Sequence, residues 1–178
     1  MRKIILQYGL LSGTLITAFT LISMYYCYQS ADMKGNMLLG FAAMFLSFSL
    51  MFPAIKKYRD GLLNGRISFG QAFLVGIGIA GIASTMYVIG WMIEYHTVMP
   101  DFLERFVNYS ILELEKAKLS PEMLAEEKAN YETYRHNYDT LPRMALVTYL
   151  EILPPGILLS LVAAFIMKRK PIPGSSVT

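Results

Sequence analysis

The stretch QAFLVGIGIAGIASTMYVIGWMIEY, residues 71–95, contains one charged side chain, Glu94. A helix needs about 20 largely apolar residues to cross roughly 30 Å of hydrocarbon, because each residue adds about 1.5 Å. A helix on the surface of a soluble protein would also carry a polar face, and this stretch has none. We therefore predict that it spans a membrane.

Three further apolar runs meet the same length criterion, at about residues 4–28, 36–55 and 144–167. The chain is 54% hydrophobic and 16% charged, with a mean hydropathy of +0.42, whereas soluble domains are about 25% charged. Arg2 and Lys3 precede the first run as in a signal peptide, but the run exceeds the usual apolar core of about 7–15 residues. We predict an uncleaved anchor and an all-α, polytopic membrane protein with four transmembrane helices. Residues 1–170 would form a single membrane domain, and residues 171–178 a short tail.

The distribution of charge predicts which way the chain faces. Basic residues outnumber acidic ones before the first run, between the second and third runs, and in the tail, whereas the long connection 96–142 is acid-rich. Lysine and arginine concentrate in cytoplasmic loops. We therefore expect a bacterial inner-membrane protein with both termini in the cytoplasm and residues 96–142 outside. Lipid headgroups account for the net charge of +3, so no nucleic-acid partner is expected.

The long outer connection has helical periodicity of its own. Leu103, Val107, Ile111 and Leu114 recur at helical spacing, with polar residues opposite. Ser120 and Pro121 are typical of the start of a second helix, which would run to about Asn137 with Tyr131, Tyr134 and Tyr138 on one side. This pattern predicts an amphipathic helical hairpin over about residues 101–138. Its apolar face could lie on the membrane surface or meet a partner, and the sequence leaves both open.

Small residues at four-residue spacing indicate close helix packing in two of the runs. They are Gly9 and Gly13 in the first run and Gly76, Ala80 and Ser84 in the third. Gly76, Gly78 and Gly81 also spell the dinucleotide motif G-x-G-x-x-G. That motif requires a preceding strand, so helix packing is favoured and no cofactor is expected.

The segment KKYRDGLLNGRISFGQAF, residues 56–73, indicates an ordered cytoplasmic turn. Pro53 stands near the predicted end of the second helix, and Ser68 and Gln71 form a capping box for the third. Tyr58, Arg59 and Asp60 are candidate binding residues. The simpler interpretation is that Arg59 contacts Asp60 or a lipid phosphate.

Two carboxylates lie within the predicted spans. Glu94 is close to Trp91 and Tyr95, which indicate the membrane interface, so its side chain is expected to reach water. Glu151 lies roughly 12 Å into the membrane, where an ionised carboxylate is costly.

Two prolines that follow Glu151 suggest why it is tolerated at that depth. Pro154 and Pro155 should bend the helix and free the carbonyls near residues 150 and 151. The favoured interpretation is structural, with a neutral Glu151 donating a hydrogen bond to such a carbonyl or to a neighbouring helix. The functional interpretation is that Glu151 lines a polar cavity that moves protons or cations.

Known catalytic and metal-binding patterns are not found in the sequence. His96 and His136 lack metal-ligand spacing, and Cys27 is the single cysteine, so neither a disulfide nor a cysteine metal cluster is expected. No G-x-S-x-G motif occurs. We expect no catalytic, cofactor-binding or metal-binding residue, and no enzymatic activity.

The segments IKKYRDGLLNGRISFGQAFLVG and YLEILPPGILLSLVAAFIMKRK give the chain a family resemblance. Over about residues 4–170 it resembles the bacterial membrane proteins grouped as domain-of-unknown-function family 4199. The resemblance implies a four-helix inner-membrane protein and brings no established activity, cofactor or catalytic residue.

These observations lead to a ranked set of expected functions. The first is an interaction, scaffold or assembly subunit that uses the outer hairpin to contact another membrane protein or a second copy of itself. The alternative is a transport or channel subunit with Glu151 in a polar intramembrane path. The third is a membrane enzyme that acts on lipid, with Arg59 holding a phosphate.

Overall fold

The computed structural model describes residues 1–30, 35–117 and 119–168, and within these ranges the chain is helical with no extended β-strand. The helices are α1 (Arg2–Gln29), α2 (Met37–Phe48), α3 (Met51–Leu62), α4 (Phe69–Thr97), α5 (Phe102–Lys116), α6 (Pro121–Asn137) and α7 (Leu141–Met167). The all-α prediction is confirmed. The predicted tail, residues 171–178, lies outside the described residues.

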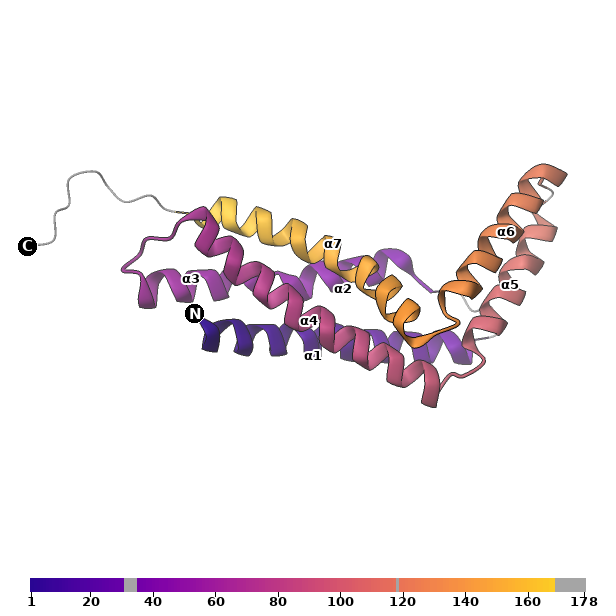
Figure 1. The fold of residues 1–178 in the computed structure, drawn as a ribbon, viewed down its shortest axis with the longest axis horizontal. Helices are drawn as coiled ribbons and strands as arrows, with labels where there is room; N and C mark the ends of the chain where they lie inside the picture. The colour runs from indigo at the N-terminus through magenta and orange to yellow at the C-terminus, as the bar shows by residue number, and fades with distance from the viewer. Residues whose placement is uncertain (31–34, 118, 169–178) are drawn as a thin grey trace, which may run out of the picture.

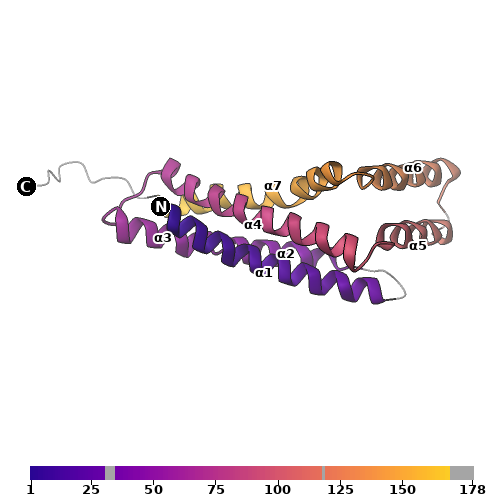
Figure 2. The same ribbon diagram turned by 60° about the horizontal axis from the view of Figure 1, so that its bottom comes forward.

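Four helical segments are long and apolar enough to cross a membrane: Arg2–Gln29, Met37–Leu62, Phe69–Thr97 and Leu141–Met167. They lie side by side, with α4 packed along both α1 and α7 (Figures 1 and 2). Half of the apolar window of α4 is buried inside the protein (50%), against 28% for each of the other three. The remaining apolar surface, which includes Leu38, Leu46 and Phe165, is exposed, as expected where lipid is the solvent.

The second span is divided between α2 and α3. The regular helix is interrupted at Ser49 and Leu50, and Pro53 lies in the first turn of α3, where its missing N–H group costs little. The chain remains helical through Lys56 and on to Leu62, where the sequence indicated a turn. The sequence indicated that Pro53 lies near the end of a helix. It lies near the start of one instead.

The actual turn after α3 is short. Asn64 and Gly65 adopt positive φ angles of 51° and 79°, and the Gly65 N–H donates to the Arg59 carbonyl at 3.0 Å. This pairing satisfies one of the carbonyls that a helix end leaves free. The turn leads directly to the N-terminus of α4.

Small residues bring α4 close to both neighbours. A Cβ atom at Gly9 or Gly13 of α1 would meet Ile82 or Met86 of α4, and one at Gly76 of α4 would lie 3.1 Å from the Ser160 Cα atom of α7. Ala80 contacts α7 at Gly156, and Ser84 is fully buried. Contact at this distance gives the van der Waals packing that holds helices together in lipid.

The pair α5–α6 extends beyond one end of the bundle (Figures 1 and 2). Phe102, Leu103 and Val107 of α5 are buried, whereas no described residue of α6 is. An ion pair from Lys128 to Glu115, at 2.7 Å, links the two helices. The predicted pair of helices is thus present, and its position outside the cell stays a prediction.

The predicted capping box at the start of α4 is confirmed. The Ser68 hydroxyl accepts a hydrogen bond from the Gln71 N–H at 3.2 Å, and the Gln71 side-chain oxygen accepts one from the Ser68 N–H at 3.1 Å. We expect Ser68→Ala to lower the free energy of unfolding by about 1 kcal/mol. Thermal unfolding in detergent measures this change. A double mutant with Gln71→Ala should lose less than the sum of the two single changes, and full additivity would contradict a reciprocal box.

Candidate functional site

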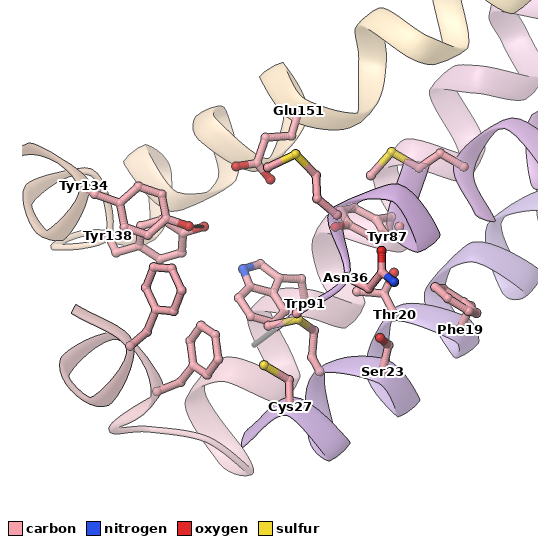
Figure 3. Close-up of a pocket in the computed structure, with 17 residues that line it drawn as sticks. Phe19, Thr20, Ser23, Cys27, Asn36, Tyr87, Trp91, Tyr134, Tyr138 and Glu151 are labelled. Carbon is pink, nitrogen blue, oxygen red and sulfur yellow. Dashed lines mark hydrogen bonds between the residues drawn. The ribbon is translucent and has the colours of Figure 1, made fainter. Parts of the chain in front are cut away.

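A pocket of ≈ 330 Å³ lies at the end of the bundle that carries α5 and α6 (Figure 3). Side chains from α1, α2, α4, α5, α6 and α7 line it, so it forms only when the whole bundle is assembled. Its volume is within the range of small-molecule sites. Of the described residues that line it, Glu151 is the one that is charged, and none is lysine, arginine or histidine.

Glu151 extends from α7 into this pocket (Figure 3), and it is an exposed residue. The helix continues through Pro154 and Pro155. Within the described residues the carboxylate forms neither an ion pair nor a hydrogen bond. The expected hydrogen bond to a freed carbonyl is therefore not found, and the carboxylate faces the pocket instead.

Six aromatic side chains form a closed cluster around one side of the pocket, with each ring in contact with the next. The successive ring-centroid distances are 5.8 Å for Trp91–Phe102, 5.9 Å for Phe102–Phe106, 6.1 Å for Phe106–Tyr134, 5.1 Å for Tyr134–Tyr138, 5.7 Å for Tyr138–Tyr95 and 6.0 Å for Tyr95–Trp91. We call these residues the aromatic cluster. All of its members except Tyr95 line the pocket. The cluster joins α4, α5 and α6, and so it holds the outer helices against the bundle.

The hydroxyl groups of Tyr134 and Tyr138 add hydrogen-bonding capacity to the pocket wall. They lie 3.3 Å apart and hydrogen-bond to each other. Partial burial raises the pKa of Tyr134, the hydrogen bond with Tyr138 lowers it, and nearby Glu151 raises it. Burial, followed by the neighbouring Tyr134, raises the pKa of Tyr138. Both groups therefore stay protonated at neutral pH and remain able to donate a hydrogen bond.

The tyrosines of α6 contact their own chain. Tyr131 and Tyr134 pack on Phe106, and Tyr138 packs on Tyr95. The sequence had left open whether this face would lie on the membrane surface or meet a partner. In the structure Tyr134 packs on α5 and Tyr138 on the end of α4, where α6 runs back along α5 towards the bundle (Figure 1).

The sequence indicated that the Glu94 side chain reaches water, and the structure shows that it does not. Its side chain is buried, with 6% exposed, and its Oε2 atom has no hydrogen-bond partner among the described residues. Leu21 and Tyr25 of α1 and Val98 surround it in a second, more apolar groove between α1 and α4. The prediction was wrong because Trp91, taken as a marker of the interface, is itself buried and packs on Phe102.

Tyr58, Arg59 and Asp60 lie at the opposite end of the bundle, in the last turns of α3 (Figure 1). Arg59 is buried, and it donates from Nε to Asp60 Oδ1 at 2.6 Å and from Nη2 to Asp60 Oδ2 at 3.1 Å. Asp60 was one of its two expected partners. The structure does not bring these residues together with Glu151.

The pocket contains several residues that sequence reasoning did not select, including Trp91, Tyr87, Tyr134 and Tyr138. The aromatic residues near the ends of the third run and in the second outer helix were visible in the sequence. That these residues meet in one pocket was not visible in the sequence, because it depends on how α6 packs against α5. No group of three potential metal ligands occurs among the described residues.

The fold and the pocket define a helical membrane protein with four candidate membrane-spanning helices. The chain belongs to the family described as "Protein of unknown function (DUF4199)", whose model matches residues 7–169. No curated protein and no solved structure matches the chain.

Proposed function

We propose that this protein binds a small ligand in the pocket beneath α5 and α6. The observation that carries this proposal is the Glu151 carboxylate, which faces a pocket of ≈ 330 Å³ without an ion-pair partner among the described residues. Acidic residues within membrane-spanning segments are costly and commonly mark ligand or ion sites. We further propose a bacterial inner-membrane location, with both termini in the cytoplasm and the pocket on the outer side.

This proposal is close to the transport or channel alternative, because it gives Glu151 the same importance. The core of the bundle between the pocket and the opposite end, where α3 carries basic residues, favours a binding site at one end over a path through the bundle. Phe48, Ile79 and Ile152 are fully buried there, and apolar packing of this kind does not provide a polar path. We therefore place binding ahead of conduction.

An interaction or scaffold role is the second proposal. It is supported by α6, none of whose described residues is buried, so its outward surface is accessible to a membrane-protein partner or a second copy. The lipid-enzyme alternative has less support, because Arg59 is buried and bound to Asp60. A ligand-binding subunit could also carry such a partner on α6.

The binding proposal is tested by filling the pocket. Gly40 lines the pocket, and a Cβ atom there would have nothing within 4 Å, so Gly40→Phe should occupy the pocket without moving the backbone. Native mass spectrometry of the protein, purified in mild detergent, should show a bound small molecule in the wild type and none in Gly40→Phe. Gly81→Phe, at a position that is also open but outside the pocket, should retain it. Equal occupancy in all three proteins, or no bound molecule in the wild type, would overturn the proposal.

A further inference from the structure

The chemistry of the pocket wall identifies the class of ligand, provided that the pocket binds one as proposed above. We propose that it binds an organic ammonium group, whose positive charge pairs with the Glu151 carboxylate while its carbon atoms contact the aromatic cluster. Neither the family nor the fold specifies such a ligand. The inference rests on the charge, the aromatic content and the size of the pocket.

The charge of the lining favours a cation. Among the lining residues that the structure describes, Glu151 is the only charged one, and none of them is basic. A carboxylate removed from bulk water is costly when ionised unless a positive charge compensates it. A bound cation would supply that compensation, whereas an anion would be repelled.

The aromatic side chains favour an organic cation. Trp91, Phe102, Phe106, Tyr134 and Tyr138 line the pocket together with Tyr87. Aromatic faces attract ammonium groups electrostatically, and cages of such residues recognise alkylated ammonium ions. The cluster comes from α4, α5 and α6, so it presents aromatic surface from several directions, as Figure 3 shows for Trp91, Tyr134 and Tyr138.

The size and the donor atoms of the pocket disfavour a bare metal ion. Calcium and magnesium ions take about six or more oxygen ligands held close together. The described lining residues offer one carboxylate, that of Glu151, and scattered hydroxyl and amide groups, such as those of Thr20, Ser23 and Asn36. A volume of ≈ 330 Å³ suits a small molecule or a lipid headgroup.

Two sources could supply the ammonium group. The pocket lies where the membrane-spanning bundle meets α5 and α6 (Figure 3), so the amine of a phospholipid headgroup and a free amine are both compatible with it. The recognition chemistry is the same in both cases, and the experiment below separates them.

The chain contains its own reporter for this test. Trp91 is the only tryptophan, and it lines the pocket, so intrinsic tryptophan fluorescence responds to occupancy of this site. The protein is purified, exchanged into lipid-free detergent and titrated with choline or with 3,3-dimethyl-1-butanol. These two probes have nearly the same shape and differ in charge.

We expect choline to change Trp91 fluorescence at concentrations at least about tenfold lower than its neutral analogue does, because the cation gains both charge pairing and cation–π contact. Glu151→Gln should remove this tenfold preference, and Glu151→Asp should restore part of it. Glu94→Gln, which lies outside the pocket, should leave the preference unchanged. Thermal unfolding of each variant establishes that it is folded.

Different results would contradict the ammonium inference, the binding proposal and the role of Glu151. Equal binding of choline and its neutral analogue, with both lost in Gly40→Phe, would overturn the ammonium inference and leave the pocket as a binding site. Absence of binding by either probe, together with no bound molecule in native mass spectrometry, would overturn both proposals. Retention of the preference in a folded Glu151→Gln protein would overturn the role of Glu151.

The source of the ammonium group is tested in lipid nanodiscs. Discs that contain phosphatidylethanolamine are compared with discs of phosphatidylglycerol alone. If phosphatidylethanolamine raises the choline concentration needed to change Trp91 fluorescence, the lipid headgroup occupies the pocket. If the lipid has no effect and choline still binds in preference to its analogue, the site takes a free amine. Both results support recognition of an ammonium group.

Discussion

Phe102→Ala is expected to lower the free energy of unfolding by about 3–5 kcal/mol, the usual cost of removing a buried phenylalanine ring. Phe102 is 6% exposed and contacts both Trp91 and Phe106. Its loss opens the aromatic cluster where α5 begins. Hydrogen exchange should therefore become faster throughout α5 and α6, while α4 and α7 are affected less.

The matched control for this change is Phe165→Ala. Phe165 is 65% exposed on α7, so the same substitution removes little buried surface and should change stability by much less. Thermal unfolding and hydrogen exchange in detergent measure both variants. Equal losses for the two, or unchanged exchange in α5 and α6 of Phe102→Ala, would contradict the claim that the aromatic cluster attaches these helices.

Gly76→Ile is expected to lower the free energy of unfolding by about 1–3 kcal/mol, as overpacking typically does. A Cβ atom at this position would lie 2.9 Å from Ser160 Cβ and 3.1 Å from Ser160 Cα. Because one of these atoms belongs to the backbone, rotation of the Ser160 side chain cannot relieve the contact, and α7 has to move away from α4.

Gly81→Ile on the same helix is the control. A Cβ atom there would have nothing within 4 Å, and replacing glycine in a helix gains a few tenths of a kcal/mol. Thermal unfolding should show a loss for Gly76→Ile and little change or a gain for Gly81→Ile. A loss of the same size at both positions would show that close contact between α4 and α7 is not what the glycine permits.

Local chemistry accounts for the parts of the fold that the sequence predicted. Span length follows from hydropathy, which is why residues 71–95 were recognised as part of α4 (Phe69–Thr97). The start of α6 followed from Ser120, whose hydroxyl accepts a hydrogen bond from the Met123 N–H at 3.3 Å, and from Pro121 in the first turn. These signals lie within a few residues of the feature they specify.

The remaining features depend on tertiary packing. The interruption at Ser49 and Leu50 falls within a uniformly apolar run, where hydropathy cannot separate α2 from α3. Trp91 and Glu94 lie near the end of α4, and whether such side chains face lipid, water or protein depends on where α1 and α5 pack.

The candidate site was predicted only in part. The sequence singled out Glu151 as a costly residue and left its role open. Most of the aromatic residues that line the pocket with it come from α4, α5 and α6, which follow one another in the chain, but their meeting depends on how these helices pack, and no local pattern encodes it. The signal of this site that the sequence did contain was a carboxylate within a predicted membrane span.

Sided labelling of two cysteine variants tests the central claim, that the bundle crosses the membrane with the pocket end outside. In a Cys27→Ser background, Lys56→Cys on α3 and Glu126→Cys on α6 are both at exposed positions. We predict that a membrane-impermeant maleimide labels Glu126→Cys in intact spheroplasts and labels Lys56→Cys only after lysis. Labelling of both variants from the same side, or of Lys56→Cys alone in intact spheroplasts, would contradict this topology.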